Sequence, residues 1–354
     1  MLKEDFTMAD KDIIMEQTED KVKGKSIAVL TSGGDAPGMN AAVRAVVRAG
    51  IGKGFKVIGV YRGYNGLLNG DVKELKLRSV SDIIGRGGTI LYTARSEEYK
   101  TPEGIKKAAE FCRSLNIVGL VVIGGDGSFK GARALAAQGI PCVGIPGTID
   151  NDIACTDYTV GFDTAMNTAL DMIDRIRDTA QSHDRCSVIE VMGRHCGDIA
   201  LQTGIAVGAT AIIVPEVPYN IEEDVIARIY EQKATGKKHF IVVVAEGVGK
   251  KGHGNIADSL ANYIEKRTGI ETRATILGHV QRGGCPTLRD RVMATAMGVA
   301  AVDILYDSVG SDEQVSRVVA SRGGKIVDFD ITEALDMPND FDKHLYDVAL
   351  RVSI

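Results

Sequence analysis

The sequence alternates, from Ser26 onward, between short apolar runs and longer segments with helical spacing. Eight runs rich in β-branched and aliphatic residues occupy positions 26–32, 55–61, 117–125, 140–147, 186–193, 210–217, 238–247 and 272–280. Several of them are apolar at every position, which is typical of strands covered by helices on both faces. The alternation therefore predicts an α/β fold with largely parallel sheets and right-handed crossover connections.

Two of the intervening segments carry clear helical signals. Pro102–Leu115 begins with proline and follows Thr101, a residue suited to the N-cap position. In Phe162–Gln181 the apolar residues recur at helical spacing, at Met166, Leu170, Ile173 and Ile176. A chain of 354 residues is long enough for two lobes, and because no glycine- or serine-rich linker divides it, we expect the lobes to be tightly joined.

Composition excludes several classes of protein. A formal net charge of −5 argues against a nucleic-acid-binding protein that depends on a basic surface. No apolar run approaches the roughly 18 residues of a membrane span. Six scattered cysteines without a C-x-x-C pair predict reduced thiols and no zinc site, as in a cytoplasmic protein. Residues 1–24 lack the apolar core of a signal peptide, so we expect an N-terminal extension, loosely ordered or a short helix, without chemistry.

Three glycine-rich segments, 31–40, 85–95 and 124–128, each follow an apparent strand. Glycine lets backbone N–H groups approach a phosphate, and a helix N-terminus adds partial positive charge. None of the three contains the P-loop pattern or the G-x-G-x-x-G pattern of a dinucleotide site. Asp126, set among glycines in the third segment, would repel phosphates unless a cation intervened, which predicts Mg²⁺. Each segment taken singly also fits a tight turn with a helix cap.

Paired acids follow the fourth apolar run. Asp150 and Asp152 flank Asn151, so in an extended chain their carboxylates point to the same side. One could deprotonate a hydroxyl group that attacks a phosphoryl group, while the other stays near the metal or orients its neighbour. The alternative interpretation is a turn held by hydrogen bonds from these side chains to the backbone.

Basic side chains lie in or beside several of the later apolar runs, namely Arg185, Arg194, Arg273, His279 and Arg282. Guanidinium groups bind phosphate in a bidentate manner, so a converging set would suit a sugar phosphate. Glu246 could accept hydrogen bonds from a sugar hydroxyl. Arg44 and Arg48, four residues apart, would share one helix face, as an anion site requires. Ordinary solvated charges remain the alternative for each of these residues unless they converge.

Five motifs together resemble the ATP-dependent 6-phosphofructokinases of the bacterial type. They are LTSGGDAPGMNAAVRAVVR, VVIGGDGS, PGTIDND, IEVMGRHCGD and TRATILGHVQRGG, and the likeness runs from about Lys25 to the mid-300s. The resemblance implies two Rossmann-like lobes, each a mostly parallel sheet sandwiched by helices. Residues 25–160 and 280–330 would form an ATP-binding lobe, and residues 161–279 and 331–354 a fructose 6-phosphate-binding lobe.

The resemblance also implies an activity, the transfer of a phosphoryl group from MgATP to the 1-hydroxyl of fructose 6-phosphate, a committed step of glycolysis. Asp150 would be the general base, assisted by Thr148, Asp152 and Arg194. ATP would contact Gly34, Arg95, Ser96, Gly125, Asp126, Gly127 and Ser128, with Asp126 binding Mg²⁺. The sugar phosphate would contact Thr148, Ile149, Asp150, Arg185, Met192, Gly193, Arg194, Glu246, Arg273, His279, Val280, Gln281 and Arg282.

Further implications concern assembly and regulation. Arg185 and Arg273 would come from a neighbouring subunit, which implies a homotetramer. An ADP or phosphoenolpyruvate effector would bind Arg44, Arg48, Arg177, Lys237, Lys238 and His239. Thr210 and Leu77 depart from the family pattern, in which a glutamate and an arginine are frequent, so an effector site of altered strength or selectivity is expected.

The phosphoryl donor is indicated by two positions. Pyrophosphate-dependent relatives usually carry aspartate and lysine where this chain has Gly127 and Gly147, so both positions favour ATP. A pyrophosphate-dependent enzyme is the close alternative. A catalytically inactive regulatory subunit is another, but it predicts damage at Asp126, Asp150, Asp152 or Arg194, and all four are present.

Overall fold

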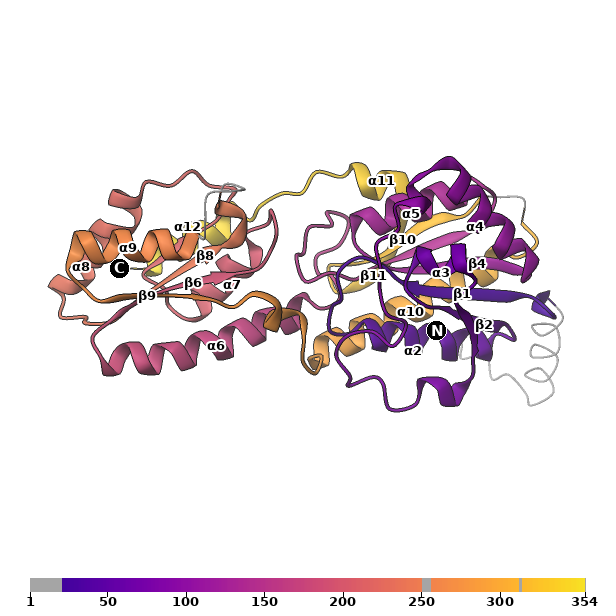
Figure 1. The fold of residues 1–354 in the computed structure, drawn as a ribbon, viewed down its shortest axis with the longest axis horizontal. Coiled ribbons are helices and arrows are strands. Elements are labelled where there is room, and N and C mark those ends of the chain that lie inside the picture. The colour runs from indigo at the N-terminus through magenta and orange to yellow at the C-terminus, as the bar shows by residue number, and fades with distance from the viewer. Residues whose placement is uncertain (1–20, 250–255, 312–313, 354) are drawn as a thin grey trace, which may run out of the picture.

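The computed structural model describes residues 21–249, 256–311 and 314–353, which form two lobes, each built around one sheet (Figure 1). The predicted α/β class with mostly parallel sheets is confirmed. Residues 1–20 of the expected N-terminal extension lie outside the described residues. Among the described helices, none combines the length and the hydropathy needed to cross a bilayer.

The first lobe contains a seven-stranded sheet. Its order is β11 (Lys325–Asp330), β10 (Ser316–Arg322), β5 (Cys142–Pro146), β4 (Ile117–Gly124), β1 (Ser26–Thr31), β2 (Lys56–Val60) and β3 (Val72–Leu75). The five inner strands are parallel, whereas β3 and β11 pair antiparallel at the two edges. Along β1, Ile27 and Val29 enter one buried cluster and Ala28 and Leu30 the other, so both faces of the sheet are covered.

Helices cover both faces of this sheet. On one face α2 (Met39–Gly52) packs against α10 (Leu288–Ser308). The other face carries α3 (Tyr64–Asn69), α4 (Pro102–Ser114), α5 (Asp126–Ala136) and α11 (Ile331–Asp336). Because α11 packs on α5, β10 and β11, the segment that the sequence assigns to the second lobe from residue 331 begins with a helix lying on the first sheet.

The second lobe contains a smaller, wholly parallel sheet in the order β7 (Ala211–Ile213), β8 (Phe240–Ala245), β6 (Cys186–Val191) and β9 (Thr272–Ile276). One face packs on α8 (Ala227–Ala234) and α9 (Ile256–Thr268). The other packs on α6 (Phe162–Ser182) and α7 (Asp198–Ala206), with α12 (Lys343–Val352) against α7.

The two helices singled out from the sequence are confirmed, and their beginnings have identifiable causes. The Thr101 hydroxyl accepts the Gly104 N–H at 3.1 Å, as expected of an N-cap. The start of α6 is held from another helix, because the buried Asp290 of α10 accepts the N–H groups of Gly161 and Thr164, each at 2.9 Å, and the Thr164 hydroxyl at 2.5 Å. This carboxylate therefore ties the helix that enters the second lobe to the first lobe.

Several sequence predictions of local structure were wrong. The strands at β3, β10 and β11 were not predicted, because they lie at or beside the sheet edges and none of them is a continuous apolar run. The run 272–280 is a strand only to Ile276, since Gly278, with φ of +56°, opens a 3₁₀ turn over Gly278–Arg282. The glycine-rich segment 85–95 does not follow a strand; it comes after a 3₁₀ turn at Leu77–Val80 and an irregular stretch.

Candidate active site

The candidate site lies at the carboxyl ends of strands from both sheets. Asp150 and Asp152 follow β5 of the first sheet, whereas Arg194 follows β6, Glu246 follows β8, and the 3₁₀ turn Gly278–Arg282 (η5) follows β9 of the second. Ligands of open parallel sheets bind at such ends. Two ion pairs cross between the lobes here, so Asp150, Asp152, Arg194 and Arg282 converge as the sequence predicts.

The first ion pair joins Asp150 to Arg282. Asp150 is 7% exposed, and its Oδ1 lies 3.5 Å from Arg282 Nη2 but has no hydrogen-bond partner among the described residues. Burial raises the pKa of this carboxyl above its ordinary value, the Arg282 charge opposes that shift, and the nearby Asp152 and Glu246 carboxylates reinforce it. A buried carboxylate with one oxygen that makes no hydrogen bond is suited to accept a proton from a ligand.

The second ion pair joins Asp152 Oδ2 to Arg194 Nη1 at 3.7 Å. Burial also raises the pKa of Asp152, and the Arg194 charge opposes it. Arg194 has φ of +58°, and its N–H donates to Glu246 Oε1 at 2.7 Å. A side chain at Gly193 would place Cβ 2.3 Å from the Cys196 carbonyl oxygen, so glycine is required before this strained arginine.

The turn that carries the two acids is anchored by Asn151. Asn151 has φ of +52°, a conformation that asparagine tolerates better than most residues. Its Oδ1 accepts the Thr159 N–H at 3.0 Å, and its Nδ2 donates to Asp198 Oδ2 at 3.2 Å across the lobes. The Thr159 hydroxyl in turn donates to the Thr148 carbonyl oxygen at 2.6 Å. The predicted turn is present, but Asn151 rather than the two aspartates supplies its anchoring side-chain bonds, and the segment is not extended as the pairing of the acids assumed.

Contacts between segments bring the three glycine-rich loops together. The Thr31 hydroxyl lies 2.9 Å from that of Thr89 and donates to the Tyr92 carbonyl oxygen at 2.8 Å. The Thr93 hydroxyl donates to the Gly33 carbonyl oxygen at 2.7 Å. The third loop joins them because a Cβ on Gly33 would lie 3.5 Å from Ser128 Oγ. The 85–95 loop thus reaches the site through tertiary contacts.

Asp126 begins helix α5 and lies beside the site. Its Oδ2 pairs with Lys130 Nζ at 2.7 Å, with the carboxylate side chain 40% exposed. Gly127 has open space where a side chain would be. No group of three or more His, Cys, Asp or Glu residues in the described part of the chain could hold a metal by itself. One accessible carboxylate next to glycine-rich backbone fits Mg²⁺, which binds through one or two carboxylates when phosphates supply further oxygens.

Arg282 connects the acids to the first glycine-rich loop. Its Nη1 donates to the Asp35 carbonyl oxygen at 3.4 Å, and a Cβ on Gly34 would lie 2.8 Å from the same nitrogen. The adjacent Gln281 is fully buried and accepts the Met192 N–H at 3.4 Å, whereas His279 and Val280 are exposed. The turn after β9 therefore presents a guanidinium between the two halves of the site.

Some predicted residues lie elsewhere in this chain. Arg185 and Arg273 lie at the amino ends of β6 and β9, where both pair with Glu271 at 2.9 and 2.6 Å. Both pairings lower the pKa of Glu271. They therefore lie at the amino ends of the strands in the second sheet, whereas Arg194 lies at the carboxyl ends. Of the remaining ATP candidates, Arg95 is exposed and Ser96 Oγ accepts the Tyr99 N–H at 3.3 Å.

The six basic residues expected at an effector site form two groups. Arg44 and Arg48 lie on α2 of the first lobe. Lys237, Lys238 and His239 precede β8 in the second lobe, and Arg177 lies close enough that its charge helps lower the pKa values of Lys237 and His239, after burial. Lys237 Nζ donates to Gln232 Oε1 at 2.8 Å, and so does the Thr210 hydroxyl. Thr210 therefore belongs to a buried hydrogen-bond network with an amide and a lysine.

Two contributors to the site were not predicted. Asp198, which binds Asn151, belongs to the motif IEVMGRHCGD, but nothing in its spacing indicated a contact across the lobes. Tyr64 donates to the Ser128 carbonyl oxygen at 2.5 Å and stacks on Tyr99 with ring centroids 4.0 Å apart, which supports the third loop from behind. Periodicity marks such residues only as core.

Comparisons with known proteins agree with this geometry. The model of the family described as Phosphofructokinase matches residues 26–305. A Clostridium botulinum (strain Hall) protein named ATP-dependent 6-phosphofructokinase is 57% identical over 329 residues, which cover 93% of this chain and 99% of that protein; a Clostridium tetani protein of the same name matches equally well.

Solved structures give the same result for the fold. Phosphofructokinase from Saccharomyces cerevisiae has a TM-score of 0.79 and 38% identity over 93% of this chain. The chain spans only 46% of that yeast chain, less than half its length. A pyrophosphate-dependent phosphofructokinase from Marinobacter aquaeolei has a TM-score of 0.78 at 22% identity, which speaks for the fold alone.

Proposed function

The chain belongs to the phosphofructokinase family, and on that premise we propose that it transfers a phosphoryl group from MgATP to the 1-hydroxyl of fructose 6-phosphate. The observation that most supports this function is the pair of aspartates after β5, each of which faces an arginine from the other lobe. Because the acids and the arginines come from different lobes, the arrangement suits two substrates that approach from opposite sides.

Asp150 is the proposed general base. It lies close to Arg282, whose other nitrogen reaches the first glycine-rich loop, so a hydroxyl group next to Asp150 would also be near the phosphates held there. Its raised pKa makes the carboxylate a better proton acceptor than an exposed aspartate. Thr148 and Ile149 hold the turn from the preceding strand, with the Thr148 hydroxyl accepting the Asp150 N–H at 3.1 Å.

Arg194 is proposed to bind the transferring phosphoryl group. A guanidinium 3.7 Å from a carboxylate can exchange that partner for a more highly charged phosphoryl group without losing a counter-ion. Asp152 would keep Arg194 oriented until the donor arrives. Met192, Gly193, Glu246 and His279 then lie on the side of the second lobe, where we propose that the sugar phosphate binds.

We propose that Asp126, with Gly125, Gly127 and Ser128, holds the donor side. When bound through Asp126, Mg²⁺ would neutralise phosphate charge during transfer. Lys130 is then freed from its ion pair with Asp126 and adds positive charge nearby. Gly34, Arg95 and Ser96 would contact the rest of the nucleotide.

ATP is favoured as donor over pyrophosphate by two glycine environments. Gly127 faces open space, so the absence of an acidic side chain leaves room for an additional phosphate. A Cβ at Gly147 would lie 3.0 Å from Ile123 Cγ2 and 3.2 Å from Met39 Cε, so the backbone there packs too closely for a long side chain. The names of the Clostridium relatives support the same donor.

Assaying the full chain with ATP and with pyrophosphate tests the donor. We expect turnover with ATP, and Gly127→Asp should lower kcat/KM for ATP by about tenfold or more because it adds a negative charge beside the phosphates. Gly52→Asp, at a glycine with equally open surroundings on the far end of α2, should leave it unchanged. Turnover with pyrophosphate alone would overturn the assignment.

We further propose a cytoplasmic homotetramer in which Arg185 and Arg273 serve the sugar phosphate site of a neighbouring subunit. Their position supports this, because they lie at the amino ends of β6 and β9, whereas the candidate site of their own chain lies at the carboxyl ends of these strands. An effector such as ADP or phosphoenolpyruvate would then bind where Arg44 and Arg48 of one copy meet the basic group before β8 of another.

A further inference from the structure

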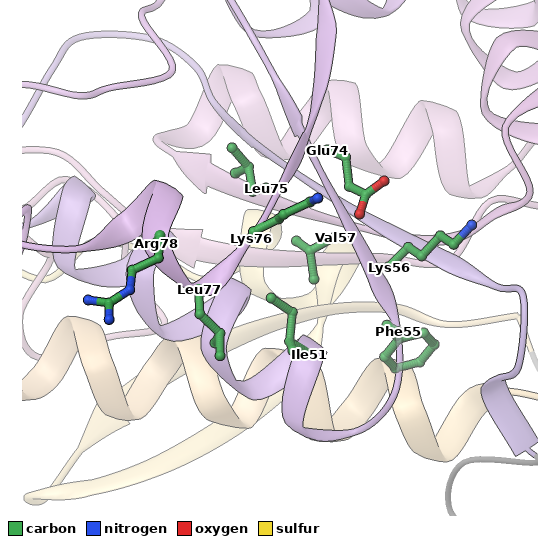
Figure 2. Close-up of a pocket in the computed structure, with 9 residues that line it drawn as sticks. All are labelled: Ile51, Phe55, Lys56, Val57, Glu74, Leu75, Lys76, Leu77 and Arg78. Atoms are coloured by element: carbon green, nitrogen blue, oxygen red, sulfur yellow. The ribbon is translucent and has the colours of Figure 1, made fainter.

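An apolar pocket of about 370 Å³ lies away from the candidate active site, beside the end of α2 and the strands β2 and β3 (Figure 2). Ile51, Phe55, Val57, Leu75 and Leu77 supply its apolar lining. Most of these side chains also belong to the core, but Leu77 is 48% exposed. An aliphatic side chain so exposed at the edge of a pocket gains free energy when another apolar group covers it.

Basic residues surround this pocket. Lys56, Lys76 and Arg78, which we call the basic rim, line it together with one acid, Glu74. All three cations of the rim are exposed, and none makes an ion pair with a residue in the described ranges. The pocket therefore fits a partner that is apolar and acidic.

Such a partner is available within the chain, in residues 1–20, which lie outside the described residues. The sequence of this segment contains seven acidic and two basic residues, and hence the whole of the chain's formal net charge of −5. It also contains apolar residues at Phe6 and at Ile13, Ile14 and Met15. The family match begins only at residue 26, so this segment is a feature of this chain outside the shared core.

The described chain begins close to the pocket. Lys21 Nζ lies 4.5 Å from the centroid of the Tyr306 ring, and that ring packs edge-on against Phe55, with centroids 6.2 Å apart. Phe55 is a lining residue. Six extended residues span about 20 Å, so the Ile13–Met15 stretch can reach the pocket from Lys21 without strain.

We propose that residues 1–20 bind this pocket in the same chain, with apolar side chains covering Leu77 and acidic side chains facing the basic rim. The exposed Leu77 and the N-terminal segment would then act together. The segment would thereby place an acidic peptide beside α2, the helix that carries Arg44 and Arg48.

Binding of a labelled synthetic peptide with the sequence of residues 1–20 tests this proposal. The acceptor is the full-length protein with Ile13, Ile14 and Met15 all replaced by serine, which weakens competition from its own segment. We expect saturable binding that adding Leu77→Glu weakens about tenfold or more, because the change removes an apolar contact and places an acid against an acidic peptide. Lys76→Glu should also weaken binding, and so should raising the salt concentration.

Val352→Glu is the matched control, since Val352 is an exposed aliphatic residue of similar exposure, 59%, on α12 of the other lobe. It should leave peptide binding unchanged. Equal affinity for the acceptors with and without Leu77→Glu would overturn the proposal.

Hydrogen–deuterium exchange supplies a second measurement on the intact protein. Amides of residues 72–80 should exchange at least about threefold faster in the triple-serine protein than in the unmodified chain, because the pocket is then uncovered. Unchanged exchange would mean that the segment does not cover the pocket, whether it is open or occupied by a second copy. Neither measurement depends on catalysis, so the proposed function is tested separately.

Discussion

Asn151 is the residue whose replacement distinguishes best between a turn that merely lies in the site and one that is held for catalysis. We predict that Asn151→Gly lowers the free energy of unfolding by about 2–4 kcal/mol, since it leaves the buried amide of Thr159 and the Asp198 carboxylate without this partner. Asn151→Ala should cost about 1 kcal/mol more, because φ of +52° suits glycine but strains alanine.

The same substitutions should affect activity. Asp150 and Asp152 are one residue away on either side, so loss of the anchor displaces both carboxylates. Displacement of a reacting group by about 1 Å can cost about 10²-fold in rate, and we expect kcat to fall to that extent with the KM for ATP little changed.

Urea unfolding and steady-state assays of the two variants measure both effects. Asn167→Ala is the control, because Asn167 is exposed and its amide bonds to Asp163 one helical turn earlier, and it should change stability by less than about 0.5 kcal/mol. Wild-type kcat in Asn151→Gly, or equal stability of the glycine and alanine variants, would refute the reasoning.

Three further predictions concern single side chains. Asp150→Asn should lower kcat by about 10²–10⁴-fold with little change in KM. Because burial raises the pKa of Asp150, the native state binds more protons than the unfolded state. The free energy of unfolding of the parent protein should therefore fall as pH rises from 3.8 through the folded-state pKa of Asp150. Urea titrations should therefore show Asp150→Asn at least as stable as the parent at neutral pH, with the difference shrinking toward pH 4, and the opposite trend would contradict the burial argument. Asp290→Ala should lower the unfolding free energy by about 3 kcal/mol, because it leaves three buried donors unpaired. Asp171→Ala, which removes an exposed ion pair on a helix, is the control and should cost under about 0.5 kcal/mol. Similar losses in both variants would count against the role of Asp290. Arg273→Ser should raise the KM for fructose 6-phosphate far more than it lowers kcat, with Arg175→Ser as an exposed control, and an unchanged KM would remove Arg273 from the substrate site.

Much of this fold was predictable from the sequence because it depends on burial. Most inner strands of both sheets are apolar almost throughout, so runs such as 117–125 and 238–247 indicated them directly, whereas β10 has polar ends and was missed. The edge strands β3 and β11 each carry several charged residues and are not continuous apolar runs. β11 pairs with β10 across the two-residue turn of Gly323 and Gly324, both with positive φ, a hairpin signal that apolar periodicity alone does not detect.

The site was predictable in its residues but not in its connections. Asp150, Asp152 and Arg194 were named from motif chemistry. That Asn151 would bind Asp198, or that Arg282 would reach the Asp35 carbonyl oxygen, depends on how two sheets are placed against each other. These contacts join residues 47 and 247 positions apart, and no local pattern encodes them.

The four-stranded sheet has a consequence for assembly, because it presents guanidinium groups at both ends. Arg194 follows β6 and Arg185 precedes it, and the six residues of that strand span roughly 20 Å of stiff backbone. In a tetramer arranged as proposed, a small tilt of this sheet would shift the anion-binding groups of two catalytic centres at once. In that arrangement, binding at one centre would affect its neighbour through a rigid-body movement of the second lobe, without any rearrangement inside the lobe.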